Sequence, residues 1–96
     1  MQCAKQDVSS FTKILKEVSQ EKRLQILCML SKEKSLCVCQ IIERLWISQN
    51  LVSHHLKILK EIWFLNTKRV GKNIHYSINQ KKFDEFKNTL KNIFNI

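Results

Sequence analysis

The hydrophobic residues of this chain change their spacing along the sequence, and the change limits the folds that the chain can adopt. Up to about residue 60, apolar side chains recur every three or four positions, which is typical of helices that bury one face. Residues 65–70 and 74–78 are instead short and rich in β-formers, with Gly71 between them. This pattern predicts an antiparallel hairpin that turns at Gly71. A helical stripe follows it, so we expect a mainly α fold with a small β-hairpin, in the order α-α-α-α-β-β-α.

The boundaries of these elements are indicated by candidate capping residues. Ser19, Ser35 and Ser48 each precede a helical stripe, and a serine hydroxyl can accept a hydrogen bond from a free amide of the first turn. Residues 1–7 precede the first stripe, and we expect them to form a flexible N-terminal arm. The last helix is expected over residues 81–95, and a chain of 96 residues suits a single domain.

The segment 36–60 is typical of a helix-turn-helix, in which two short helices are joined by a tight turn. Val52, Leu56 and Leu59 form an apolar stripe on its second helix. The other face is polar and suited to base edges and phosphates. The candidate DNA-binding residues on it are Ser48, Gln49, Asn50, Ser53, His54 and Lys57. We expect His55 to pack or bond within the protein, because adjacent helical residues point about 100° apart.

The predicted hairpin, residues 65–78, adds positive charge beside this unit. It carries Lys68, Arg69 and Lys72, which suit contacts with a phosphate backbone. Lys plus Arg number 17 against 8 for Asp plus Glu, and the formal net charge is +9. Such an excess favours nucleic acid as a partner first and an anionic membrane surface second. The hairpin and the two helices together predict a winged helix-turn-helix that binds DNA.

Other classes of protein are disfavoured by what the sequence lacks. It has no apolar run long enough to cross a bilayer and no N-terminal signal pattern, so we expect a cytoplasmic protein without a membrane partner. It has no glycine loop for phosphates and no recognisable nucleophile with a base, so an enzyme is not expected. A small module that uses the winged fold to hold protein or RNA stays an alternative.

Four segments carry a resemblance to a known family. They are ISQNLVSHHLKILKE at 47–61, FLNTKRVGKNIHYSI at 64–78, LCVCQII at 36–42 and KRLQIL at 22–27. Together they resemble the bacterial arsenic-repressor (ArsR/SmtB) family of metal-sensing winged-helix transcriptional repressors. The resemblance implies a homodimer formed by the first and last helices, which binds double-stranded operator DNA with a two-fold repeat. The amphipathic stripes on those two helices suit that role.

Cys37 and Cys39 stand one residue apart at the predicted start of the third helix. The resemblance implies that their thiolates bind a regulatory ion, As(III), Cd(II), Pb(II) or Zn(II), and that binding releases the DNA. Residues two apart in a regular helix point about 200° from one another, so one ion can join both only where the first turn is irregular. A disulfide between them is the least favoured interpretation, because adjacent positions strain the bond and the compartment is reducing.

Three further points about the cysteines stay open. A trigonal ion needs a third donor, and the resemblance implies that Cys3 in the N-terminal arm of the partner subunit can supply it. Cys28 is expected in the core. The alternatives to metal sensing are a redox switch through Cys37, Cys39 and Cys3, or two small apolar residues with no inducer at all.

Trp46 and Trp63 stand where the family has glycine, each directly after a predicted helix. Such positions favour a left-handed backbone, in which a bulky residue costs about 1–2 kcal/mol. One interpretation is that the two indoles pack on the core and the turns adapt. The other is that the source organism reads UGA as glycine, so that both residues are glycine in the native protein. The single glycine of the chain, Gly71, fits the second interpretation.

Overall fold

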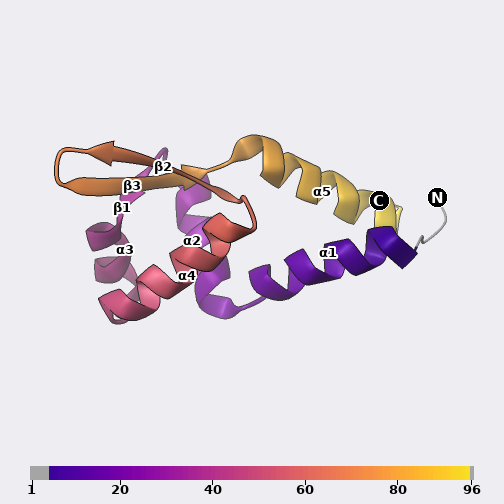
Figure 1. Cartoon of the computed structure of the whole chain (residues 1–96), viewed down its shortest axis with the longest axis horizontal. Helices are drawn as coiled ribbons and strands as arrows, with labels where there is room; N and C mark the ends of the chain where they lie inside the picture. Colours follow the sequence, from indigo (N-terminus) through magenta and orange to yellow (C-terminus); the bar gives the residue numbers. More distant parts are fainter. Residues whose placement is uncertain (1–4, 96) are drawn as a thin grey trace.

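A computed structural model describes the backbone of residues 5–95 and the side chains from Val8 to Asn95. The fold is mainly helical with a small antiparallel sheet, as predicted, and Figure 1 labels its elements. In chain order they are α1 (Lys5–Val18), α2 (Glu21–Lys32), β1 (Leu36–Cys37), α3 (Val38–Leu45), α4 (Gln49–Glu61), β2 (Leu65–Val70), β3 (Asn73–Ile78) and α5 (Gln80–Phe94).

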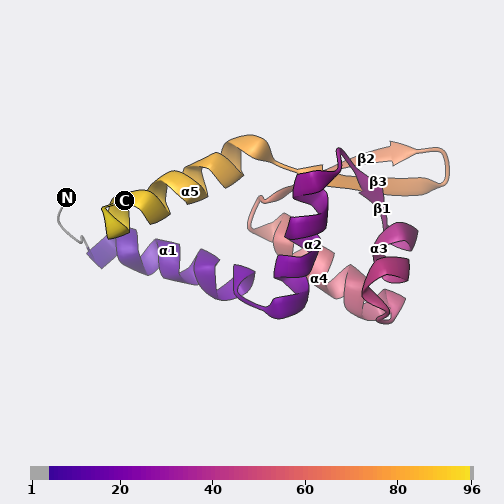
Figure 2. The same cartoon turned by 180° about the vertical axis from the view of Figure 1, so that it is seen from behind.

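The molecule is elongated, with principal extents of 48 × 22 × 20 Å. Helices α1 and α5 lie side by side at one end, where α1 begins and α5 ends (Figures 1 and 2). Their contact includes the stacked rings of Phe11 and Phe86, whose centroids are 5.1 Å apart. Helices α2, α3 and α4 and the hairpin of β2 and β3 occupy the rest of the molecule. The tip of the wing and α3 thus lie at the opposite end of the molecule from the two chain-terminal helices, while the last part of α4 lies close to them.

The core lies where α2, α3 and α4 meet the hairpin. Ile26, Ile41 and Leu59 are completely buried there, one from each helix. Phe64, which follows α4, is also completely buried and packs edge-on against Phe83 of α5. Burial of each such side chain contributes about 1.5–3 kcal/mol. These contacts hold α4 against the other helices by one face only.

Strand β1 is an element that the sequence analysis missed. Leu36 pairs with Tyr76 and Cys37 with His75, so that β1 lies at the edge of a three-stranded sheet in the order β1-β3-β2. Ser35 was expected to cap a helix at this point, and that expectation is wrong. Helix α3 begins only at Val38, because Leu36 and Cys37 are held in extended conformation by their pairing with β3.

Helices α1 and α2 also begin differently from the prediction, whereas α4 begins after Ser48 as predicted. Helix α1 begins at Lys5, so residues 5–7 of the predicted arm have helical backbone. The cap of α2 is Gln20, whose side chain accepts from two amides of the first turn, while the hydroxyl of Ser19 donates to the carbonyl of Lys16. Ser48 does cap α4, since the amide of Leu51 donates to its Oγ at 3.2 Å.

Trp46 and Trp63 both have a left-handed backbone, with φ of 58° and 67°. After α4, the amide of Trp63 donates to the carbonyl of Lys60 and that of Phe64 donates to the carbonyl of Leu59. This pair of bonds is the Schellman ending of a helix, in which the left-handed position is usually glycine. The indoles are 90% and 70% exposed, so the interpretation that they pack on the core is wrong.

Candidate nucleic-acid interface and cysteine site

Helix α4 has one buried face and one polar, exposed face. Val52, Leu56 and Leu59 are at most 1% exposed, and they hold the helix to the core. The hydroxyl of Ser48 accepts the capping bond and can still donate its own hydrogen, for instance to a phosphate. The remaining predicted DNA-binding residues of this helix are all exposed on its other side: Gln49, Asn50, Ser53, His54 and Lys57. A helix that reads a major groove needs such short hydrogen-bonding groups on its free face.

The hairpin forms the predicted wing beside α3 and α4. Its strands pair in register from Leu65 opposite Ile78 to Val70 opposite Asn73, and the chain turns at Gly71, where φ is 62°. Lys68, Arg69 and Lys72 are all exposed on it.

The three basic side chains of the wing point in different directions, because successive strand residues point to opposite faces of a sheet. Lys68 and Arg69 therefore lie on opposite faces of the wing, and Lys72 lies at its tip. The tip extends toward the same end of the molecule as α3 and the start of α4 (Figures 1 and 2). The two strand residues thus face different surroundings.

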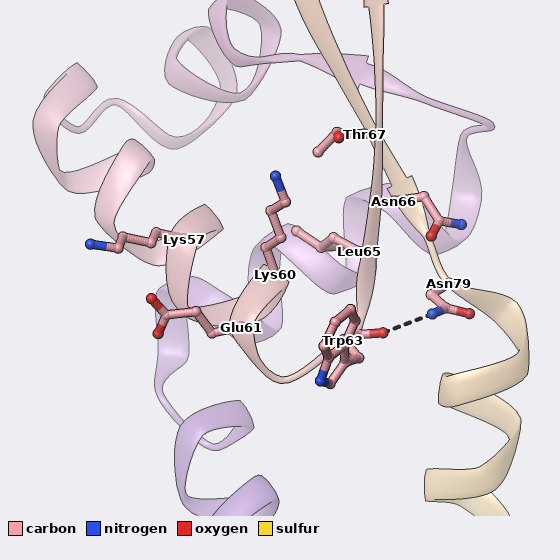
Figure 3. A pocket seen from close by; sticks show the side chains of 8 residues that line it. All are labelled: Lys57, Lys60, Glu61, Trp63, Leu65, Asn66, Thr67 and Asn79. Carbon is pink, nitrogen blue, oxygen red and sulfur yellow. Dashed lines mark hydrogen bonds between the residues drawn. The ribbon is translucent and has the colours of Figure 1, made fainter.

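Positive charge continues along α4 to its last turn, where the sequence analysis had no candidate. A groove of about 630 Å³ lies between this turn, the start of β2 and the start of α5, and Lys57, Lys60 and Glu61 line it (Figure 3). The exposed Trp63 forms part of its wall. The side-chain amide of Asn79 donates to the Trp63 carbonyl at 3.0 Å and so ties this turn to α5.

Cys37 and Cys39 form a disulfide in this structure, with their Cα atoms 5.4 Å apart. The expectation that a disulfide is the least favoured form is therefore wrong for this structure. The reason is that Cys37 does not belong to the helix. It precedes α3 with an extended backbone, φ −82° and ψ 163°, and its amide donates to Oε1 of Gln40 at 2.9 Å. The divergence of 200° that a regular helix imposes does not apply, and the two sulfur atoms converge.

The two cysteines differ in solvent exposure, and they lie where the wing meets the helix-turn-helix. Cys37 is 6% exposed, whereas Cys39 is exposed. Cys37 is paired with His75 of the wing through β1, and it directly precedes α3 of the helix-turn-helix. Cys37 therefore connects the wing to the helix-turn-helix.

Known proteins that are similar to this chain are named as regulators of transcription. The family "Bacterial regulatory protein, arsR family" matches residues 20–62. A CadC homolog of Staphylococcus aureus, a cadmium resistance transcriptional regulatory protein, is 33% identical over 81% of this chain and 64% of its own length. An arsenical resistance operon repressor of the same organism is 37% identical over 85% of this chain and 77% of its own. The chain belongs to the bacterial arsR family.

The fold of this arsR-family chain is shared with solved members. HlyU from Vibrio cholerae superposes with a TM-score of 0.75 at 26% identity, over 97% of this chain and 100% of that one. The relatives of this chain are transcriptional regulators and not enzymes. They confirm the expectation that the chain is not an enzyme. In residues 5–95 no helix is both long and apolar enough to cross a membrane. The cytoplasmic location stays a prediction.

The cysteine pair fits the metal site expected of an arsR-family sensor in donor type but not in donor number. Thiolates are soft donors that suit thiophilic ions. Among the side chains that the structure describes, however, no group of three His, Cys, Asp or Glu is placed to hold a metal ion. Cys3, the predicted third donor, lies outside the described residues. Cys28 is free and exposed on α2, so the expectation that it belongs to the core is wrong.

The prediction that His55 bonds within the protein is confirmed. It is 6% exposed, and its Nδ1 accepts a hydrogen bond from Nε of Arg23 at 3.2 Å. Burial, followed by the charges of Arg23 and His54, lowers the pKa of His55. Sequence reasoning missed the role of Arg23, for which the only available signal was the KRLQIL segment.

Proposed function

We propose that this chain is a transcriptional repressor that binds operator DNA as a homodimer and leaves it when a thiophilic metal or metalloid binds Cys37 and Cys39. The observation that carries the DNA-binding part is the two-sided character of α4. Its apolar face is fully used by the core, and the opposite face offers amide, hydroxyl and imidazole groups to solvent. These groups are exposed, and they match the donors and acceptors on base edges.

The proposed DNA contacts divide into two kinds. On α4, Gln49 and Asn50 can each form two hydrogen bonds with an adenine, while Ser53 and His54 meet neighbouring base edges. On the wing, Lys72 and one of Lys68 and Arg69 meet phosphates, which position the protein without reading sequence. Ser48 and Lys57 also contact the backbone. Specificity therefore lies on the helix and much of the affinity on the cations.

A homodimer through α1 and α5 is proposed from the apolar residues that these helices leave exposed. Val8 and Leu15 of α1 are 37% and 40% exposed, and Phe94 of α5 is 64% exposed. All three belong to the terminal pair of helices, α1 and α5, which extend away from the tip of the wing (Figure 1). A second copy that covers them would place two recognition helices in a two-fold arrangement, which suits a repeated DNA half-site.

The metal response is supported by the position of the cysteines and by the relatives. In the reduced protein, two thiolates at the start of α3 can bind one As(III), Cd(II) or Pb(II), or Zn(II), with Cys3 of the partner subunit as the proposed third donor. The amides at the start of a helix favour negative charge on sulfur. The ion would then favour a placement of α3 and the wing that suits DNA poorly. Relatives named for cadmium and arsenical resistance agree with such an inducer.

The disulfide favours a second candidate, regulation by oxidation of the same pair. The exposed Cys39 thiolate attacks a peroxide and gives a sulfenic acid, while the peroxide oxygen–oxygen bond breaks and one oxygen leaves as water or an alcohol. The Cys37 thiolate then displaces hydroxide from that sulfur, and the disulfide forms. The two sulfur atoms lose two electrons in all. Disulfide and metal use the same sulfur atoms, so they exclude each other.

Both candidates are tested with a duplex that the reduced protein selects from a random-sequence pool, labelled with fluorescein and followed by anisotropy. Cd(II), As(III) or Zn(II) is expected to weaken binding by a factor between about 5 and 150, the usual range of coupling between two sites. Cys37→Ser and Cys39→Ser should bind the duplex like wild type and show no release. Cys28→Ser is the matched control, because that thiol is exposed on another helix.

The possible outcomes separate the parts of the proposal. Release by peroxide but by none of the ions would support the redox candidate, and release by neither would leave a repressor without an inducer of these kinds. Failure to select any duplex, or binding that does not weaken as salt is raised, would overturn the DNA-binding function itself.

A further inference from the structure

We infer that Arg23 is a positioning residue for the recognition helix, and that it ties α4 to the end of α1. This inference rests on the proposed DNA-binding function and goes beyond it. It assigns to one partly buried side chain, which touches no DNA in the proposed interface, control over where α4 lies. It also names a route by which the pair of terminal helices can affect DNA binding.

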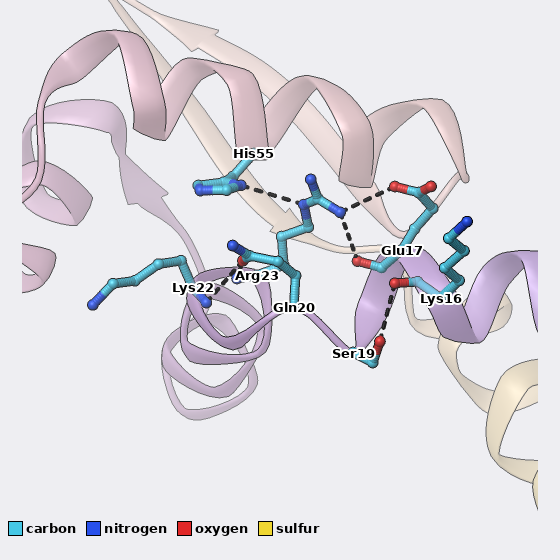
Figure 4. A network of polar contacts seen from close by, with 7 residues as sticks. All are labelled: Lys16, Glu17, Ser19, Gln20, Lys22, Arg23 and His55. Atoms are coloured by element: carbon cyan, nitrogen blue, oxygen red, sulfur yellow. Dashed lines mark hydrogen bonds and ion pairs between the residues drawn. The ribbon is translucent and has the colours of Figure 1, made fainter.

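The geometry is a three-way junction between helices (Figure 4). Arg23 belongs to α2, and its Nε donates to Nδ1 of His55 on α4 at 3.2 Å. Its Nη1 donates to the backbone carbonyl of Glu17 at 3.1 Å and to the carboxylate of Glu17 at 3.0 Å. Glu17 lies in the last turn of α1. One guanidinium group thus bonds to two helices besides its own.

The bonds of Arg23 stabilise a polar group on each of the two neighbouring helices. The last carbonyl groups of α1 have no partner further along the helix, and a cation at a helix C-terminus is favourable. On the other side, His55 is 6% exposed, and an imidazole nitrogen without a partner at such a position would be unfavourable. Arg23 satisfies both groups, and its own side chain is only 11% exposed.

The bonds of Arg23 are directional, unlike the apolar contacts of α4. Val52, Leu56 and Leu59 attach α4 through apolar packing, which scales with area and has little preference for direction. A guanidinium is planar, and its donors have fixed angles to one another. It therefore restricts the rotation and tilt of α4 relative to α1 in a way that packing does not.

The bond to His55 requires an unprotonated Nδ1, and the surroundings favour that state. The charged and titratable groups that face His55 are Arg23 from α2, Glu17 from α1 beyond Arg23, and His54 from its own helix. The Glu17 carboxylate bonds to Arg23 and leaves the imidazole to accept from Nε. The neutral ring is thus the acceptor of a charged donor, which is among the stronger kinds of hydrogen bond.

The inference predicts how variants of this 96-residue chain bind the selected duplex. Arg23→Met should weaken binding by the fully folded protein about tenfold, as the loss of one charge-assisted bond would. His55→Leu should weaken it equally, and the double variant should be no weaker than either single variant. His55→Gln keeps an acceptor and should restore wild-type affinity. Lys22→Met is the matched control for lost charge, since Lys22 points away from the junction in Figure 4.

Folding and DNA binding are measured separately, so that a structural role can be told from a positioning role. Circular dichroism establishes that each variant is folded at the temperature of the binding assay. Should Arg23→Met fail to fold, Arg23→Lys serves in its place, because a single ammonium cannot make the same fork of bonds and should also weaken binding. Folded variants that are less stable but bind with wild-type affinity would overturn the inference alone. A wild type that selects no duplex would overturn the proposed function, and the inference with it.

Discussion

The backbone at Trp46 and Trp63 leads to a prediction about stability that compares glycine with alanine at the same position. Both residues have positive φ, where a side chain other than glycine costs about 1–2 kcal/mol. Substitution by either Gly or Ala removes the same indole, so the lost contacts cancel in the comparison. Two differences remain. Backbone strain disfavours the alanine variant, and the greater entropy of glycine in the unfolded chain disfavours the glycine variant.

The magnitude follows from these two opposing terms. Glycine avoids about 1–2 kcal/mol of strain and loses about 0.4–1 kcal/mol through unfolded-state entropy. Trp46→Gly should therefore be about 1 kcal/mol more stable than Trp46→Ala, and the same should hold at Trp63. For a domain of this size that is a difference of roughly 4–8 °C in Tm. Urea unfolding at one fixed protein concentration measures it, since the stability of the proposed dimer would depend on concentration.

Ile62 provides the control, because it is next to Trp63 but has a negative φ of −91°. There Ile62→Ala should be more stable than Ile62→Gly. The stability difference between the glycine and alanine variants thus reverses its sign from Trp63 to the neighbouring residue. The reasoning is refuted if alanine is as stable as glycine at Trp46 and Trp63. The intact mass of protein from its native host is a separate test of the recoding hypothesis, and unchanged tryptophan mass at both positions rules it out.

Three further predictions concern pH, DNA and the core. The pKa of His55 is lowered in the folded protein from its ordinary value of 6.5. The contribution of His55 to the free energy of unfolding is therefore complete above pH 6.5 and is lost as the pH falls through the folded pKa. Urea unfolding at a series of pH values should show this loss in wild type and not in His55→Gln. Lys72→Ala should weaken binding of all duplexes alike and reduce the salt slope by about 1, whereas Gln49→Ala should relax base preference at one position by about 1–3 kcal/mol, as binding titrations of sequence variants can measure. Leu59→Ala should lower the free energy of unfolding by about 2–5 kcal/mol, while Leu24→Ala, at a side chain 48% exposed, should change it by less than about 0.5 kcal/mol in a denaturant titration.

The sequence alone determined the helical elements, the wing and the direction of α4. These features are encoded locally: a stripe at Val52, Leu56 and Leu59 can be buried only if the opposite face is exposed, whatever packs against it. The turn at Gly71 and the cap at Ser48 depend on their own backbone and on the next few residues. The need for a left-handed backbone at the ends of α3 and α4 could be expected for the same reason.

The tertiary structure decided what depends on distant partners. Strand β1 has two residues and exists only because β3 pairs with it, and this pairing takes Cys37 out of the helix and lets its sulfur reach Cys39. The bond between Arg23 and His55 joins residues 32 positions apart, and no periodicity in the sequence indicates it. Local patterns report the conformation of a segment, because they reflect its backbone and its nearest neighbours. Contacts between segments depend on how the whole chain packs, so the cysteine geometry and the junction at Arg23 became visible only in the folded molecule.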